Sequence, residues 1–138
     1  MSKAAVIYWS GTGNTEAMAN AIAAGMTEKG LAPEVFAVAA APKDLADFTH
    51  LAFGCPSMGA EVLEESEFEP YFTEIEGSLN GKKVALFGSY GWGDGEWMRD
   101  WHARTQKTKA TLFDEGLIMQ DAPNGDDCKK HGSQFAAF

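Results

Sequence analysis

A polar loop near the start of the chain, residues 10–15 (Ser-Gly-Thr-Gly-Asn-Thr), most strongly constrains what this sequence can fold into. The apolar run 4–9 before the loop shows no alternation, which is typical of a parallel strand buried on both faces. After the loop, apolar residues recur with helical spacing at Met18, Ile22 and Met26. A glycine-rich turn between a strand and a helix presents backbone N–H groups and hydroxyls at one place. The loop therefore predicts a site for a small anion, and phosphate fits best.

The same loop lacks the residues of several better-known phosphate sites. No Lys or Arg occurs between residues 4 and 28, so the lysine of a nucleotide P-loop is missing. Glu16 stands where a dinucleotide fingerprint needs its third glycine. The cysteine and arginine of a tyrosine-phosphatase loop are also absent. From the loop alone, a phosphate cradle of neutral donors and an ordinary strand-to-helix turn are equally good interpretations.

The rest of the chain repeats the alternation of apolar strand and amphipathic helix. Strands are predicted at 4–9, 33–38, 50–55, 84–89 and 110–119, the last interrupted around 114–116. Helices are predicted at 15–29, 39–48, 68–77 and 96–109, and a short last helix follows a turn at 122–125. Asn14 or Thr15 is the predicted cap of the first helix. This order predicts one α/β domain over residues 1–138, a three-layer, doubly wound, five-stranded parallel sheet.

Two further loops follow predicted strands and carry unusual chemistry. In doubly wound sheets, ligands bind beyond the carboxyl ends of the strands, so loops 10–15, 56–61 and 89–95 should meet there. Trp92 lies between glycines and can stack on a flat ring, while Met58 can cover the opposite face. A phosphate at one end and a planar ring at the other indicate a mononucleotide. An adenine nucleotide stays open, although no magnesium ligands accompany the phosphate loop.

Residues 10–15, 55–61 and 88–97 together resemble the motifs of short-chain flavodoxins of the clostridial type, and the similarity covers nearly the whole chain. The resemblance implies the flavodoxin-like fold with strand order 2-1-3-4-5 and non-covalently bound FMN. It also implies a low-potential, one-electron carrier between redox proteins, using the semiquinone/hydroquinone couple, and not an enzyme.

By this resemblance, residues 10–15 bind the FMN phosphate, Trp92 stacks on the outer ring face and Met58 on the inner one. The peptide between residues 59 and 60 lies near flavin N5, and Glu61 lies near N3. The ribityl and pyrimidine side is lined by Ser57, Ser89, Gly91 and Gly93. The full set of implied cofactor-binding residues is Ser10, Gly11, Thr12, Gly13, Asn14, Thr15, Pro56, Ser57, Met58, Gly59, Ala60, Glu61, Ser89, Tyr90, Gly91, Trp92, Gly93 and Asp94.

The charges near this site predict a low potential. Carboxylates close to the ring, among them Glu61, Glu64, Glu65 and Asp94, should disfavour an anionic reduced flavin by tens to low hundreds of millivolts, roughly. A phosphate bound by neutral donors keeps its charge and acts in the same direction. Ala60 departs from the family pattern of Asp, Asn or Gly. If residues 58–61 form a type II turn in the semiquinone, Ala60 needs a positive φ, so we expect a weaker semiquinone than in Ala60→Gly.

Composition limits the partners and the compartment. The net charge of −9 disfavours nucleic acid and anionic membranes. Seven carboxylates in residues 61–76 form either a solvated face or a docking face for basic redox proteins. Two cysteines without a C-x-x-C motif favour a reducing compartment. With no apolar run of about 20 residues, we expect a cytoplasmic protein, and a monomer.

Several residues have blander interpretations. Trp9, Trp97 and Trp101 are expected in the core, Cys55 as a buried apolar residue, and Cys128 as partly exposed. The three histidines lack metal-ligand spacing. A flavin-dependent NAD(P)H or quinone reductase on the same fold is the main alternative, but it usually needs a basic residue for the nicotinamide phosphates. A phospho-acceptor signalling domain would need paired acids where Trp9 and Ser10 stand.

Overall fold

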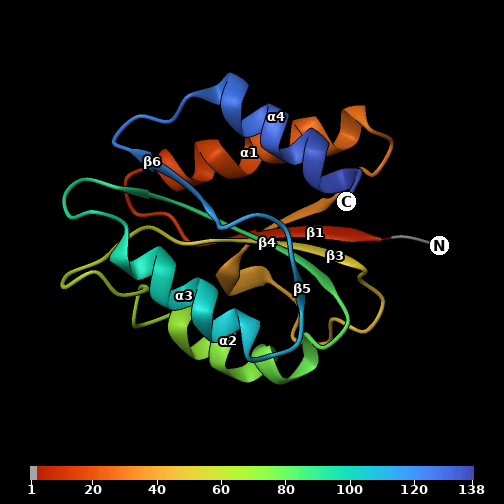
Figure 1. Cartoon of the computed structure of the whole chain (residues 1–138), viewed down its shortest axis with the longest axis horizontal. Helices are drawn as coiled ribbons and strands as arrows, with labels where there is room; N and C mark the ends of the chain where they lie inside the picture. The colour runs from red at the N-terminus through yellow and green to blue at the C-terminus, as the bar shows by residue number, and fades with distance from the viewer. Residues whose placement is uncertain (1–2) are drawn as a thin grey trace.

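A computed structural model describes residues 3–138 and shows a sheet with a pair of helices on each face (Figure 1). All strand pairs are parallel, in the order β2-β1-β3-β4-β5, and β6 also pairs with β4. The strands are β1 Ala4–Tyr8, β2 Glu34–Ala37, β3 His50–Gly54, β4 Lys83–Tyr90, β5 Thr111–Leu112 and β6 Leu117–Gln120. The helices are α1 Asn14–Glu28, α2 Phe68–Ile75, α3 Glu96–Gln106 and α4 Gly125–Ala136. The three-layer doubly wound fold and the strand order 2-1-3-4-5 are confirmed.

The sheet is covered on both faces, as the unalternating apolar strands predict. Residues 4–7 of β1 are at most 1% exposed. One face packs against α2 and α3, which contribute Phe72 and both Trp97 and Trp101. The other face packs against α1 and α4, with Ile22 and Phe135 in its core. The core positions predicted for Trp97 and Trp101 are confirmed.

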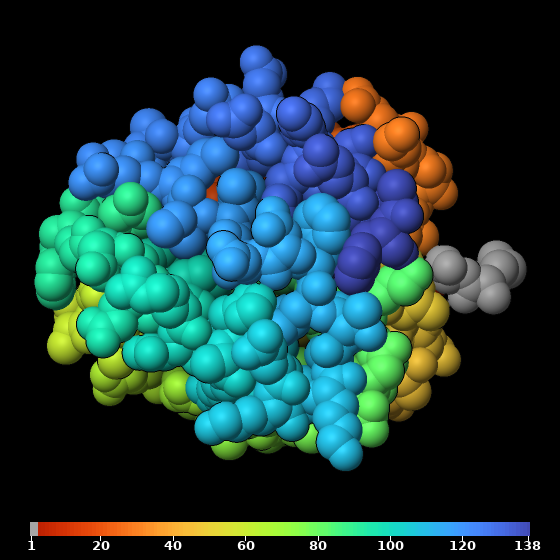
Figure 2. Space-filling view, in the orientation of Figure 1, coloured from red at the N-terminus to blue at the C-terminus, as the bar shows by residue number. Residues whose placement is uncertain are grey.

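The last strand is split, as the sequence predicts. Gly116, with φ of 103°, lies between β5 and β6, and the two segments pair with opposite ends of β4. Figure 2 shows the surface formed by the second half of the chain, where α3, the β5–β6 segment and α4 lie side by side. Within residues 3–138, no helix combines the length and the apolar character that crossing a membrane requires.

Four local predictions are wrong. Residues 39–48 contain no α-helix, only the end of a single 3-10 turn at Val38–Ala40, because short alanine-rich segments do not form stable helices without packing. Gly13, with φ of 96°, precedes α1 where a side-chain cap was expected. Helix α3, predicted over residues 96–109, ends at Gln106. Cys128 is fully buried, and burial raises the pKa of its thiol to about 11.

Candidate functional site

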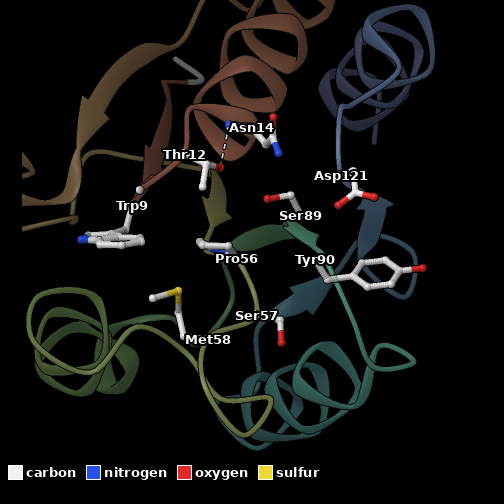
Figure 3. Close-up of a pocket in the computed structure, with 11 residues that line it drawn as sticks. Trp9, Thr12, Asn14, Pro56, Ser57, Met58, Ser89, Tyr90 and Asp121 are labelled. Carbon is white, nitrogen blue, oxygen red and sulfur yellow. Dashed lines mark hydrogen bonds between the residues drawn. The ribbon is translucent and has the colours of Figure 1, made fainter.

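The loops after β1, β3 and β4 come together at the carboxyl edge of the sheet, on the left of Figure 1. Between them lies a cavity of about 230 Å³ (Figure 3). Nine of the predicted site residues line it: Gly11, Thr12, Asn14, Pro56, Ser57, Met58, Ser89, Tyr90 and Gly91. The convergence of these three loops on one cavity agrees with the topology argument.

The first loop turns into α1 through backbone and hydroxyl groups alone. The Ser10 hydroxyl accepts a hydrogen bond from the Gly13 N–H at 3.1 Å, and the Thr12 hydroxyl accepts from the Asn14 N–H at 3.5 Å. These N–H groups belong to the positive end of the α1 dipole. The loop therefore offers an anion several neutral donors and no cationic side chain.

Thr15 ties the first loop to the third one. Its side chain is fully buried and shares a hydrogen bond of 2.9 Å with the Ser89 hydroxyl at the end of β4. Thr15 does not itself line the cavity, whereas Ser89 does. The sequence predicts the Thr15 hydroxyl as a helix cap or a phosphate donor. In the structure, this hydroxyl fixes the relative position of two walls of the cavity.

The second loop is a tight hairpin. Met58 and Val62 form a two-way backbone pair, with N···O distances of 2.9 and 3.0 Å. Between them, Gly59 and Glu61 have positive φ values of 50° and 56°, whereas Ala60 does not. In this structure the strained non-glycine position is therefore Glu61, and the idea that Ala60 weakens the semiquinone stays a prediction for the reduced protein.

The third loop presents a large aromatic side chain to solvent. Trp92 is 65% exposed, and Met58 on the neighbouring loop is 36% exposed. Glu61 connects the two loops, because its Oε1 accepts the Asp94 N–H at 3.0 Å. Two exposed apolar side chains on loops joined by a hydrogen bond are what a flat ring ligand could cover.

Two residues that line the cavity were not predicted from the sequence as site residues. Trp9, expected in the core, is half-buried and lines the cavity, while its indole N–H donates to Glu67 at 3.1 Å. Asp121 follows β6 with φ of 56°, and its N–H donates to the Tyr90 carbonyl at 2.8 Å. Because Asp121 also follows a strand at the same edge, the topology rule that selected the other loops could have found it.

Glu64 does not act as a free charge near this cavity. Burial would raise the pKa of Glu64, but hydrogen bonds from the Ser66 hydroxyl and from the N–H groups of residues 68, 67 and 66 outweigh that effect and lower it. These N–H groups lie at the start of α2, so the carboxylate stabilises a helix N-terminus. Glu64 therefore has a structural role at the start of α2, and its effect on the flavin potential stays a prediction.

Comparison with known proteins agrees with this geometry. The family model for flavodoxin matches residues 6–132. The chain belongs to the flavodoxin family. It is 46% identical to a flavodoxin of Megasphaera elsdenii, over 95% of this chain and 96% of the relative. It is 48% identical to a flavodoxin of Clostridium beijerinckii, over 95% and 97% of the two chains.

The fold comparison gives the same family. A solution structure of two-electron-reduced Megasphaera elsdenii flavodoxin matches with a TM-score of 0.89 and 44% identity, covering 98% of this chain and 99% of the other. As a flavodoxin, the protein binds FMN and transfers electrons between other redox proteins, and it is an electron-transfer flavoprotein rather than an enzyme. The resemblance inferred from the three motifs is confirmed.

The residues present fit FMN. A neutral donor set at a helix N-terminus suits the phosphate. Trp9, Pro56, Met58 and Tyr90 give the cavity apolar walls, and Ser57 and Ser89 add hydroxyls that can pair with a polyol chain. Among residues 3–138 no cluster of three or more His, Cys, Asp or Glu side chains could hold a metal ion.

Proposed function

We propose that the three-loop cavity is the FMN site and that the protein is a low-potential electron carrier. The observation that supports this most is the meeting of loops 10–15, 56–61 and 89–95 around one cavity with neutral donors at one end. The FMN phosphate takes the place of the Ser10 and Thr12 hydroxyls as acceptor for the N–H groups at the start of α1. FMN supplies the redox chemistry, and the chain supplies binding and electrostatics.

Met58 and Trp92, both exposed on loops that Glu61 connects, would hold the ring between them. Ser57, Ser89 and Asp121 are the residues that would hold the ribityl chain, since all three line the cavity next to the phosphate loop. Gly59, Ala60, Glu61, Gly93 and Asp94 form the rim on the side of the flavin pyrimidine.

The low potential follows from charge. The phosphate loop holds no cation, and Glu61 and Asp94 lie on the two ring loops. An electron added to the flavin therefore meets the negative charge of the phosphate and of Glu61, and that of Asp94 in part, because Arg99 pairs with Asp94. Because these carboxylates are partly solvated, the effect of each is much smaller than that of a buried charge pair.

Redox partners dock at the acidic face around the cavity mouth, which we define as Glu65, Glu67, Asp94 and Asp121. All four are exposed. Reduced protein should pass electrons to a basic acceptor such as cytochrome c at a rate that falls about tenfold or more between low and high salt. A rate independent of salt, or equal rates for wild type and Glu65→Gln/Glu67→Gln, would exclude this docking face.

The chain works as one flavin domain and as a monomer. Among residues 3–138 the exposed large apolar side chains are Val35, Met58, Val62, Trp92 and Phe138, and three of them belong to the Met58–Val62 hairpin or the third loop. A light-scattering mass of two chains for the FMN-bound protein would contradict this. Both thiols are buried and free, which fits a reducing cytoplasm.

The test of the site is an FMN titration of the flavin-free protein, followed by flavin fluorescence. Wild type should bind one FMN, and Trp92→Ala and Met58→Ala should each bind it more weakly, while Val35→Ala on β2 should bind like wild type. Unchanged affinity in both loop variants would exclude the proposed ring position. Rapid reduction of the bound flavin by NADH or NADPH alone would instead indicate a reductase.

A further inference from the structure

We propose that Arg99 is a positioning residue of the flavin site, which fixes the third loop through Asp94 and offsets the charge of Asp94 beside the ring. This inference rests on the proposed FMN site. Arg99 lies in the first turn of α3 and does not line the cavity. It is also not among the cofactor-binding residues predicted from the three sequence motifs. It is the only cationic side chain in the described part of the chain that bonds to a residue of the three loops.

The geometry of the guanidinium is suited to positioning. Arg99 Nη1 donates to the Asp94 carbonyl at 3.0 Å, and Nη2 donates to the Asp94 carboxylate at 3.0 Å. One planar group thereby fixes both the backbone and the side chain of the same loop residue. On its other side, the Asp94 N–H donates to Glu61. Asp94 is therefore linked both to α3 and to the hairpin that carries Met58.

The third loop benefits from such a link because its other bonds to the rest of the fold are few: Asp94 N–H to Glu61, Gln120 Nε2 to the Gly91 carbonyl and Asp121 N–H to the Tyr90 carbonyl. Three of residues 91–95 are glycines, and Gly93 and Gly95 have φ values of 89° and 93°. Glycine has more backbone freedom to lose than any other residue. Trp92 contributes little packing, since 65% of it is exposed. With Asp94 released, Trp92 would sample positions away from the ring, and FMN would bind more weakly.

The two ring loops are in direct contact at the same point. A Cβ added to Gly93 would lie 1.8 Å from Glu61 Oε1, so the Glu61 carboxylate packs against the Gly93 backbone. Moving Asp94 would therefore also move Glu61, and with it the hairpin. The side chain of Arg99 is 62% exposed and that of Asp94 is 77% exposed, so salt should weaken the pair.

Arg104 provides a matched control on the same helix. It also loses one positive charge on substitution by Gln, but it pairs with Glu69 and Glu76 of the α2 region and not with a flavin loop. Arg104→Gln should therefore lower thermal stability while leaving the FMN dissociation constant close to that of wild type.

The experiment measures FMN dissociation constants and flavin potentials for wild type, Arg99→Gln, Arg99→Lys and Arg104→Gln. In Arg99→Gln the dissociation constant should rise roughly two- to fivefold at low salt, and less at high salt. The equilibrium for the last electron should shift about threefold toward the oxidised side, or roughly 30 mV lower. Arg99→Lys should restore the charge effect but only part of the affinity, since it cannot form both bonds.

An epistasis test separates this idea from a general effect of charge. In an Asp94→Ala background, the loss of affinity caused by Arg99→Gln should shrink to less than half of its wild-type size. Equal affinities and equal potentials in Arg99→Gln and Arg104→Gln would overturn the inference. Failure of the proposed site itself is seen separately, as unchanged FMN binding in Trp92→Ala, which does not involve Arg99.

Discussion

The hydrogen bond between Thr15 and Ser89 shows how single residues shape this site. It connects the first turn of α1 with the end of β4, and it is the buried link between the phosphate end and the third loop. A buried polar pair contributes modestly when made, but leaving one partner unpaired costs more. The pair therefore serves both stability and the spacing of the two loops.

Thr15→Val keeps the shape of the side chain and removes the hydroxyl. We expect it to lower the free energy of unfolding by about 1–2 kcal/mol, measured by urea denaturation. FMN affinity should fall as well, because the Ser89 hydroxyl loses its anchor. Thr15→Ser, which retains the hydroxyl, should lose less affinity, and equal losses in both variants would argue against the role of the hydrogen bond.

At the residue scale, the sequence predicts side chains on loops better than side chains at strand ends. Met58 and Trp92 could be found because glycine neighbours place a large apolar side chain where no core can form. Trp9 could not, since a strand-end aromatic can turn to the core or to the cavity. The structural role of Glu64 could not be predicted, because its hydrogen bonds to α2 depend on the fold of residues 64–68.

Among the elements, the contact of α1 with α4 is unusually close. A Cβ on Gly25 would lie 1.9 Å from the Lys129 carbonyl oxygen, and one on Gly132 would lie 2.0 Å from that of Ile22. Both obstacles are backbone atoms, which cannot move aside without moving a helix. Glycine is thus required at these two helical positions although it weakens an isolated helix.

Gly25→Ala and Gly132→Ala should each destabilise the protein by about 1–3 kcal/mol or more, despite the better helix propensity of alanine. Gly125→Ala at the start of α4 is the control, because its added Cβ meets no atom within 4 Å. Thermal unfolding of the three variants measures the difference. A stabilised Gly25→Ala or Gly132→Ala protein would contradict the close contact.

Two buried histidines, His50 on β3 and His131 on α4, lie in this layer, and we expect them to make stability pH-dependent. Burial lowers the pKa of His50, with a further contribution from Lys83, and burial lowers that of His131 against the opposing effect of Asp114. His50 packs on Phe135, and His131 packs on Phe113. Neither Nε2 has a hydrogen-bond partner within residues 3–138.

Because both folded-state pKa values lie below the unfolded value of about 6.5, protons bind the unfolded chain more readily. Stability should be full above about pH 7 and fall as the pH drops through that value, by at most about 1.4 kcal/mol per pH unit for each histidine. Urea denaturation near pH 7.5 and near pH 5.5 tests this. His131→Gln should show a smaller pH dependence, and an unchanged one would contradict the assignment.

The elements themselves follow from the sequence where burial decides them. Strands covered on both faces read as unbroken apolar runs, and the split of the last strand was visible in residues 114–116. The region 39–48 was not predictable in the same way, since alanine suits a helix but gives too little apolar surface to pack one. The N-cap of α1 could not be predicted from side-chain preferences, because Gly13 occupies that position through its left-handed backbone conformation and no side chain caps the helix.

For the whole molecule, charge is distributed unevenly between the flavin end and the rest. The ion pairs Lys3–Glu34, Lys43–Glu74 and Lys129–Glu28, and those of Arg104, all lie away from the three loops. Within residues 3–138, Arg99 is the one cationic side chain that pairs with an acid of the three loops. The acids at the flavin end therefore have fewer cationic partners than those in the rest of the described chain, and we expect them to act on the flavin.

The central claim is that this negative end, with a phosphate bound by neutral donors, holds the flavin at low potential. An anaerobic redox titration of the FMN-bound protein, followed by its visible spectrum, measures this directly. We expect the last electron to be accepted at a potential lower than in free FMN by roughly tens to low hundreds of millivolts. A bound flavin whose last electron is accepted near the potential of free FMN, or above it, would show that the negative end does not lower the potential.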